Sequence, residues 1–405
     1  MKIDILHYTA PPVVGGVESV IAHHARLMAD AGHSVRILAG RGDQFDERIP
    51  FVSIPEVDSR HPEIEALKLK LDQGIIPPQL DNLVTRLADI LSQTCVATQM
   101  LIAHNVCSLN KNLALTAALK QIHESRRIQR LMLWHHDLAW TTPRYRSELH
   151  EGAPWDLLRQ DWSGAIQVTI SETRQKELAS LIGVPLERIR VIPAGLDLER
   201  FQKLEPQTQD LIVKLDLLAA APLLLLPVRI TPRKNIELAI DVMAVLRNYF
   251  PQARLVVTGP LGPHNPANAQ YFDSLRNLRS ELGLKDSVHL LAEYSAAYLP
   301  DPVIADFYRL ADALLLPSKE EGFGIPILEA GLTGIPIFCA DIPQLRELGM
   351  AEVWYFSPQA EPADVARMVS QVLSQDARSR LRWRVRREYT WGNIYQKHIA
   401  PLLES

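Results

Sequence analysis

Short apolar segments alternate with amphipathic helical segments along most of this 405-residue chain. The first half is predicted to hold strands at residues 2–8, 34–39, 100–103, 131–134, 165–170 and 188–193. The second half repeats the pattern with strands at residues 223–228, 254–258, 287–291, 313–317 and 335–340. Strands that alternate with helices form parallel sheets, because each helix carries the chain back to the start of the next strand. We therefore predict an α/β fold with two doubly wound domains that face a cleft.

The length of the chain also favours two domains over one ordinary core. The less regular stretch 199–220 is predicted to be the linker between residues 1–198 and residues 221–375. Residues 376–405 are predicted to be a helical tail, with packing back onto the first domain as one arrangement. Six arginines between positions 378 and 387 spread around most of this helix, which favours a solvated helix over one that lies on an anionic membrane.

Composition limits the class of partner. A net charge of −4 gives no overall attraction to nucleic acid. Three widely spaced cysteines favour a reducing compartment. The N-terminus lacks a signal-peptide core, and the longest apolar stretch, 217–228, is far shorter than the roughly 20 residues that cross a bilayer. We therefore expect a soluble cytoplasmic protein without a transmembrane segment. Peripheral membrane contact stays open, and the oligomeric state is not indicated.

The segment 318–330 (SKEEGFGIPILEA) follows an apolar strand and leads into a helix. Two glycines form a turn, and Pro326 suits the first turn of the helix. Glu321 lies at the start of the loop, and Glu329 follows eight positions later on the helix. Two carboxylates placed in this way can bind the hydroxyls of a polyol, while the backbone N–H groups between them can face a phosphate. The alternative is that the helix dipole alone favours these acidic residues.

Two basic residues flank another strand end in the same half of the chain. Arg229 and Lys234 are five positions apart around the predicted start of a helix. Together with the positive end of the helix, they can bind a diphosphate. A solvated basic turn is the alternative.

The first half of the chain offers three further candidates. Gly15 and Gly16 allow the backbone to approach a ligand closely, or form a simple turn. His135 and His136 follow a strand, where one of them can polarise a sugar hydroxyl or fill a structural role. Histidine spacing suited to zinc is missing, so we predict that no metal or other cofactor is required. The loop after them is rich in aromatic and arginine residues that suit a sugar and an anionic group, or a structural lid: Trp140, Arg144 and Arg146.

Taken in this order over nearly the whole length, these motifs resemble the retaining glycosyltransferases of family 4, which have the GT-B fold. The resemblance includes the glycine loop, the segment 191–197 (VIPAGLD), the Arg/Lys pair and the EX7E motif from Glu321 to Glu329. It implies two Rossmann-like domains, an N-terminal one that binds the acceptor and a C-terminal one that binds a nucleotide-diphosphate sugar. It also implies hexosyl transfer with retention and without a metal.

The resemblance assigns roles to individual residues. Glu329 would hold the ribose hydroxyls of the nucleotide, and Glu321 would bind hydroxyls of the donor sugar. Backbone N–H groups at residues 323–325 (Phe323, Gly324 and Ile325) would support that sugar. Arg229 and Lys234 would neutralise the diphosphate, which Gly15 and Gly16 would approach from the first domain. His136 would be the histidine near the donor sugar, with His135 as the competitor.

The acceptor is identified only by a further resemblance. Residues 133–140 and 154–159 are similar to enzymes that mannosylate glucosyl-3-phosphoglycerate. We therefore expect transfer from a GDP-mannose or UDP-glucose type of donor to a small phosphorylated or carboxylated glycoside, with Trp140, Arg144 and Arg146 contacting the acceptor. A sugar-nucleotide epimerase or hydrolase of the same fold is one alternative, and a non-catalytic sugar-nucleotide-binding subunit is another.

Overall fold

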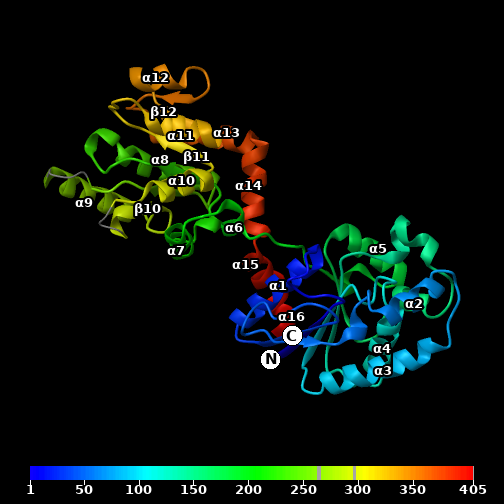
Figure 1. The fold of residues 1–405 in the computed structure, drawn as a ribbon. Helices are drawn as coiled ribbons and strands as arrows, with labels where there is room; N and C mark the ends of the chain where they lie inside the picture. Colours follow the sequence, from blue (N-terminus) through cyan, green and yellow to red (C-terminus); the bar gives the residue numbers. More distant parts are fainter. Residues whose placement is uncertain (262–265, 295–297, 405) are drawn as a thin grey trace. The chain divides into compact units, whose positions relative to one another are not determined.

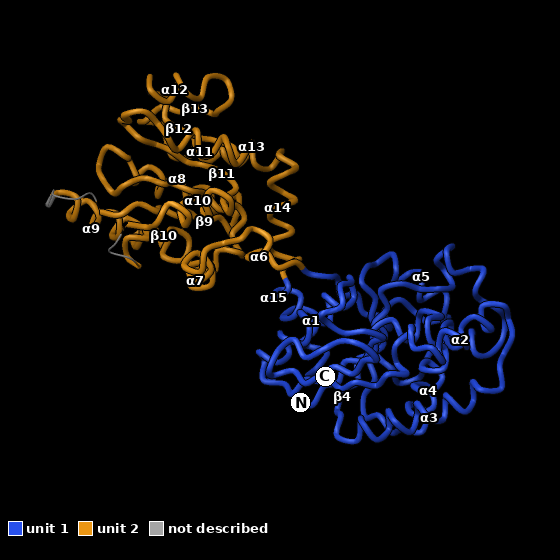
Figure 2. Tube along the Cα trace, viewed as in Figure 1, with its two compact units in different colours: residues 1–195, 391–405 blue, residues 196–390 orange. Residues whose placement is uncertain are grey.

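The computed structural model describes residues 1–261, 266–294 and 298–404. The chain divides into two compact units (Figure 2). Unit 1 consists of Met1–Gly195 and Trp391–Ser405, and unit 2 consists of Leu196–Thr390.

Unit 1 is built on a parallel seven-stranded sheet in the order β3-β2-β1-β4-β5-β6-β7. The strands are β1 Lys2–Leu6, β2 Ser34–Ala39, β3 Phe51–Ser53, β4 Met100–His104, β5 Leu131–His135, β6 Ile166–Thr169 and β7 Ile189–Val191. The helices are α1 Gly16–Asp30, α2 Pro62–Leu71, α3 Gln79–Thr94, α4 Leu113–Glu124, α5 Glu172–Ile182, α15 Trp391–Ile394 and α16 Ala400–Glu404. All residues of β4 and β5 are buried, as expected for strands with helices on both faces of the sheet.

Unit 2 is built on a parallel six-stranded sheet in the order β10-β9-β8-β11-β12-β13. The strands are β8 Leu223–Leu226, β9 Arg254–Val257, β10 Val288–Leu290, β11 Ala313–Leu316, β12 Ile337–Ala340 and β13 Trp354–Phe356. The helices are α6 Leu198–Gln202, α7 Pro206–Lys214, α8 Ile236–Tyr249, α9 Pro266–Glu281, α10 Asp301–Leu310, α11 Ile325–Thr333, α12 Pro343–Gly349, α13 Pro362–Gln375 and α14 Ala377–Glu388 (Figure 1).

The two doubly wound α/β units confirm the predicted fold class. The sequence did not reveal the edge strands β3 and β13, each of three residues. Such short segments contain too few positions for a periodic pattern to stand out.

The boundaries between the units differ from the expected ones. Residues 199–220 contain α6 and α7, and buried side chains of this stretch belong to the core of unit 2. The end of the chain is divided: α14 belongs to unit 2, whereas α15 and α16 belong to unit 1. Ile394, Ile399 and Leu403 are buried in the same core as β1. These apolar side chains explain why the last residues pack on the first sheet.

The arginine-rich helix α14 is not fully solvated. Arg386 is buried and pairs with the buried Asp312 at 2.6 Å, while its guanidinium also donates to backbone carbonyls. Arg382 donates to the carbonyl oxygens of Ala311 and Arg309. The remaining arginines of this helix are exposed: Arg378, Arg380, Arg384 and Arg387. The helix therefore uses one face to hold the end of α10 and the start of β11.

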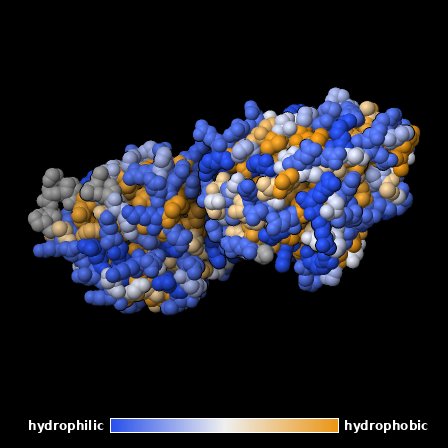
Figure 3. All heavy atoms as spheres, turned by 90° about the horizontal axis from the view of Figure 1, so that it is seen from below, coloured by the Kyte–Doolittle hydropathy of each residue, from blue (hydrophilic) through white to orange (hydrophobic). Residues whose placement is uncertain are grey.

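The hydropathy of the surface and of the helices is relevant to membrane contact. Hydrophilic residues cover most of the face shown in Figure 3, with hydrophobic patches between them. Among the described residues, no helix combines the length and the apolar character needed to span a bilayer.

Both sheets reverse their strand order at one point, which places the candidate site. The reversal lies between β1 and β4 in unit 1 and between β8 and β11 in unit 2. Loops that leave the carboxyl ends of neighbouring strands diverge there, and the crevice between them is where open α/β sheets bind ligands. The loops after β8 and β11 contain the two motifs singled out in the second half of the sequence.

Candidate active site

The glycine turn after β11 is a helix cap. Gly324 has φ 104° and is the N-cap of α11, in a left-handed conformation that suits glycine. A β-carbon at this position would lie 2.8 Å from Cδ2 of Leu345, so a side chain would also collide with α12. The turn leaves Glu321 in the loop and Glu329 on the helix, whereas Phe323 and Ile325 are each 57% exposed.

Lys234 and Glu321 form a buried ion pair between the two loops. Nζ of Lys234 lies 2.6 Å from each carboxylate oxygen of Glu321. The side chains are only 9% and 7% exposed, respectively. Because both charged groups are largely removed from water, each needs the opposite charge of the other to offset the hydration that it has lost. The pair therefore fixes the cation and the acid at one place beside the switch point.

Asn235 and Lys319 hold the same two loops together. Asn235 has φ 55°, and its side-chain amide donates to the carbonyl oxygens of Pro317 and Pro358 at 3.1 and 3.0 Å. The backbone N–H of Lys319 donates to the carbonyl oxygen of Arg233 at 2.8 Å. These bonds connect the turn after β8 with the turn after β11 and, through Pro358, with the segment after β13.

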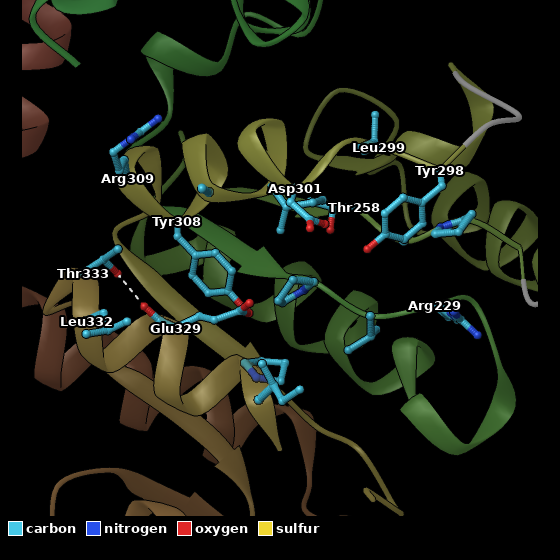
Figure 4. A pocket seen from close by; sticks show the side chains of 18 residues that line it. Arg229, Thr258, Tyr298, Leu299, Asp301, Tyr308, Arg309, Glu329, Leu332 and Thr333 are labelled. Atoms are coloured by element: carbon cyan, nitrogen blue, oxygen red, sulfur yellow. Dashed lines mark hydrogen bonds between the residues drawn. The ribbon is translucent and has the colours of Figure 1, made fainter. Parts of the chain in front are cut away.

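Arg229 differs from Lys234 in its surroundings. Its side chain is exposed and makes no hydrogen bond or ion pair with any residue in the described part of the chain. It lines a cavity of about 730 Å³ in unit 2, to which Glu329 also contributes. In Figure 4, Arg229 lies apart from Glu329, with Tyr298 and Asp301 above the space between them. As far as the described residues go, Arg229 is thus an unpaired cation at this cavity.

Tyr308 is the partner of Glu329 and was not found from the sequence. Its hydroxyl donates to Oε2 of Glu329 at 2.5 Å, from helix α10 to helix α11 (Figure 4). Burial and this carboxylate raise the pKa of Tyr308 far above its ordinary value, so the phenol stays protonated. One oxygen of Glu329 is thereby held, and Oε1 stays available to the cavity. The sequence contains no local pattern that predicts this contact, because 21 positions separate the two residues.

In unit 1, Gly15 and Gly16 lie at the start of α1, after the switch-point strand β1. Gly15 is the N-cap, and Gly16 has open space around the position of a β-carbon. Glu18 lies in the first turn, where its carboxylate accepts a hydrogen bond from Thr9 and lies 3.9 Å from Nε2 of His7. The backbone of Gly16 is thus open to approach, while Glu18 is a candidate that the sequence did not single out.

The two adjacent histidines at the end of β5, His135 as its last residue and His136 directly after it, point to different partners. Nε2 of His135 lies 2.8 Å from Oε1 of Gln167 on β6. Nε2 of His136 lies 3.0 Å from Nδ1 of His104, at the end of β4 beside the switch point. Burial lowers the pKa of His136 to about 3 and that of His135 to about 4, so both rings are neutral at pH 7. The position of His136 is the one that suits a ligand at the switch point.

The three predicted acceptor residues have unequal surroundings. Trp140 donates through its indole N–H to the carbonyl oxygen of Trp155, and the guanidinium of Arg159 lies over its ring at 4.1 Å. Arg144 is exposed and pairs with Asp137 at 3.4 Å. Arg146 is exposed. Trp140 therefore has a structural role here, and the arginines keep their guanidinium groups near solvent.

Across the described ranges, no group of three or more His, Cys, Asp or Glu side chains is placed to hold a metal ion. The expectation that no metal takes part stays a prediction.

Two family models together match most of the chain. The model for "Glycosyltransferase Family 4" matches residues 14–200, and the model for "Glycosyl transferases group 1" matches residues 209–388. The chain belongs to the group 1, family 4 glycosyltransferases. The two matches correspond closely to units 1 and 2, and the two parallel sheets agree with the GT-B fold.

The curated relatives are glycosyltransferases as well. A D-inositol 3-phosphate glycosyltransferase from Thermobispora bispora is 34% identical over 44% of this chain and 40% of its own length. A protein of the same name from Streptosporangium roseum is 26% identical over 90% of this chain and 81% of its own. An MMP alpha-(1->4)-mannosyltransferase from Mycolicibacterium hassiacum is 23% identical over 86% and 83%. The match to the Thermobispora relative spans less than half of that protein.

Among solved structures, sucrose-phosphate synthase from Thermosynechococcus elongatus aligns with 100% of this chain and 98% of its own at 18% identity. The TM-score of this alignment is 0.38.

Proposed function

We propose that this glycosyltransferase moves a hexose, with retention, from a nucleotide-diphosphate sugar to an acceptor hydroxyl. The observation that supports this most is the arrangement around the β8/β11 switch point. Two cations, Arg229 and Lys234, follow β8, and two carboxylates, Glu321 and Glu329, follow β11. Such a set suits a ligand that combines a diphosphate with hydroxyl-rich groups at both ends.

The donor would bind with its nucleoside in the cavity of unit 2. Glu329, with Oε2 held by Tyr308, would offer its other oxygen to the ribose hydroxyls. Glu321 would bind hydroxyls of the donor sugar beside the backbone N–H groups of residues 323–325. A GDP-mannose or UDP-glucose type of donor fits this description.

Bond breaking would be assisted by charge. Cleavage of the anomeric C–O bond leaves positive charge on the sugar and additional negative charge on the diphosphate. Arg229 and Lys234 would stabilise that leaving group without a metal ion, and the fixed position of Lys234 means that little reorganisation is needed. The acceptor hydroxyl would then attack on the face from which the diphosphate departs, and its proton would pass to the departing phosphate oxygen. Glu321 is already paired with Lys234, so we assign it to binding instead of nucleophilic attack.

We propose a phosphorylated or carboxylated acceptor. Arg144 and Arg146 are exposed in the loop after β5, where they could meet an anionic group. Two of the relatives are named for D-inositol 3-phosphate, which is itself a phosphorylated polyol.

All three cysteines are buried and unpaired, which supports a reducing, cytoplasmic location.

Substitution of Arg229 by alanine tests the diphosphate assignment, with Arg233→Ala as the matched control. Both side chains are exposed cations of the same loop. We expect Arg229→Ala to lower kcat by about 10²-fold or more, the scale for loss of one charge-stabilising group. Arg233→Ala should stay near the wild-type rate. Equal rates for both variants would remove the assignment.

Product analysis tests the reaction class. UDP-, GDP- and ADP-sugars are incubated with phosphorylated, carboxylated and neutral acceptors. A transferase releases the nucleoside diphosphate only when the acceptor is present. Release without an acceptor would indicate a hydrolase, a new sugar epimer would indicate an epimerase, and binding without either product would indicate a non-catalytic subunit.

A further inference from the structure

Four histidines meet below the switch point of unit 1, far more than the predicted role of one histidine requires. His7 follows β1, His24 lies on α1, His104 ends β4 and His136 follows β5. Their exposed fractions are 4%, 1%, 0% and 9%, respectively. Each neutral imidazole has one N–H donor and one acceptor nitrogen, so the partners of the two ring nitrogens indicate where the proton lies. Both ring nitrogens of His24 lack a hydrogen-bond partner among the described residues, so this ring does not take part in the hydrogen bonds of the cluster.

Hydrogen bonds connect three of these residues in a chain. Nδ1 of His7 lies 2.7 Å from the carbonyl oxygen of His104. A carbonyl only accepts, so the proton of neutral His7 is on Nδ1. Nδ1 of His104 lies 3.0 Å from Nε2 of His136, and one of these two nitrogens must donate to the other.

The surroundings of His104 decide which nitrogen donates. Its other ring nitrogen, Nε2, is buried and has no hydrogen-bond partner. A proton there would add a second unpaired buried N–H beside the indole N–H of Trp134, at a greater cost than an unpaired acceptor nitrogen. The ring is stacked on Trp134 with 20° between the planes, so an in-plane N–H does not point at that π face, and the centroid of the tilted His24 ring is 5.8 Å away. The proton of His104 is therefore assigned to Nδ1.

This assignment fixes the proton of His136 as well. If Nε2 of His136 accepts from His104, the single proton of the neutral ring is on Nδ1. Nδ1 makes no hydrogen bond with a described residue. The backbone N–H of His136 donates to Oδ1 of Asn105 at 2.7 Å, which holds the start of the loop in place. Burial, followed by the charges that His7 and His135 would carry, lowers the pKa of His136 and keeps the ring neutral.

We propose that His104 is a positioning residue that locks His136 as the Nδ1–H tautomer, so that His136 presents a hydrogen-bond donor to a hydroxyl of the bound sugar. This inference rests on the proposed function for the identity of the ligand. It also restricts the chemistry: a nitrogen that carries a proton in the neutral ring donates to a sugar oxygen and does not take a proton from the acceptor hydroxyl. His136 thus binds and orients, and it is not the general base.

The tautomer can be measured directly by long-range ¹H–¹⁵N correlation spectra of the full-length protein at pH 7. The signals of His136 are identified by their loss in His136→Phe. We expect a protonated Nδ1 and an unprotonated Nε2 in the wild type. His104→Asp places a hydrogen-bond acceptor near the position of Nδ1 and should switch His136 to the Nε2–H form, because only then does Nε2 have a partner for its proton. His104→Asn, whose amide N–H lies near the place of Nδ1, should preserve the Nδ1–H form.

Kinetics provide the second measurement. We expect kcat to fall about tenfold in His104→Asp, which is the upper range for one neutral hydrogen bond, and to stay near the wild-type value in His104→Asn. A wild-type Nε2–H signal for His136, or an unchanged tautomer in His104→Asp, would overturn the proposal. The wild-type spectrum tests it even if a variant does not fold. Correct tautomers in a protein that transfers no sugar would refute the proposed function and leave the positioning role intact.

Discussion

Lys234→Met removes one partner of the ion pair beside the β8/β11 switch point and keeps most of the side-chain volume. Because the two side chains are only 9% and 7% exposed, the carboxylate of Glu321 would be left almost without solvent and without a counter-charge. Breaking one partner of such a pair costs about 3–5 kcal/mol of unfolding free energy. For a unit of this size, each 1 kcal/mol lowers Tm by about 2–4 °C, so we expect a decrease of roughly 6–20 °C.

Thermal unfolding of three further variants shows whether burial is the cause. Glu321→Gln leaves the ammonium unpaired and should cost a similar amount, whereas the double variant should regain most of the loss because no buried charge remains. Lys319→Met is the matched control. It breaks a pair with Glu237 whose side chains are 45% and 35% exposed, and should cost at most about 1 kcal/mol.

The same set separates stability from catalysis. The double variant should unfold near the wild-type temperature yet show no transfer, because the cation and the sugar-binding carboxylate are both gone. If Lys234→Met is no less stable than Lys319→Met, the pair is not desolvated in solution, and the reasoning from its burial is wrong.

Three further predictions concern other parts of the chain. Tyr308→Phe frees Oε2 of Glu329 and should weaken nucleoside-diphosphate binding by up to tenfold in calorimetry, with unchanged affinity contradicting the contact. Arg386→Met breaks a pair with side chains 3% and 0% exposed and should cost at least 3 kcal/mol in urea unfolding, whereas the exposed Arg384→Met should cost under about 0.5 kcal/mol. Burial lowers the pKa of His24 from 6.5 to about 3, so the unfolded chain binds a proton below pH 6.5 that the folded chain does not. Stability should therefore fall by about 1.4 kcal/mol per pH unit for this group as the pH drops from 6.5 toward 4. His24→Phe should reduce the slope of that part of the pH profile by this amount, because the other buried histidines keep their own contributions, and an identical profile would contradict the buried neutral ring.

Local patterns were sufficient for the parts of the fold that depend on neighbours in the sequence. Apolar runs such as residues 313–317 predict buried strands because a parallel strand covered on both faces needs apolar side chains in succession. The glycine turn before α11 is likewise local, because the left-handed conformation of Gly324 is a property of one residue. The eight-residue spacing from Glu321 to Glu329 also required no tertiary information.

Long-range packing decided the rest. Lys234 and Glu321 are 87 positions apart and meet only because β8 pairs with β11, and no local pattern encodes that pairing. Burial of Arg386 against Asp312 was hidden for the same reason, since the sequence of α14 alone resembles a solvated helix. The sequence by itself determined two parallel α/β halves and the residue types available for a nucleotide sugar. Only the tertiary structure decided which charged side chains pair with each other, as Lys234 and Glu321 do, and which, like Arg229, stay exposed to a ligand. The physical reason is that burial and the distance between partners are properties of the assembled sheet.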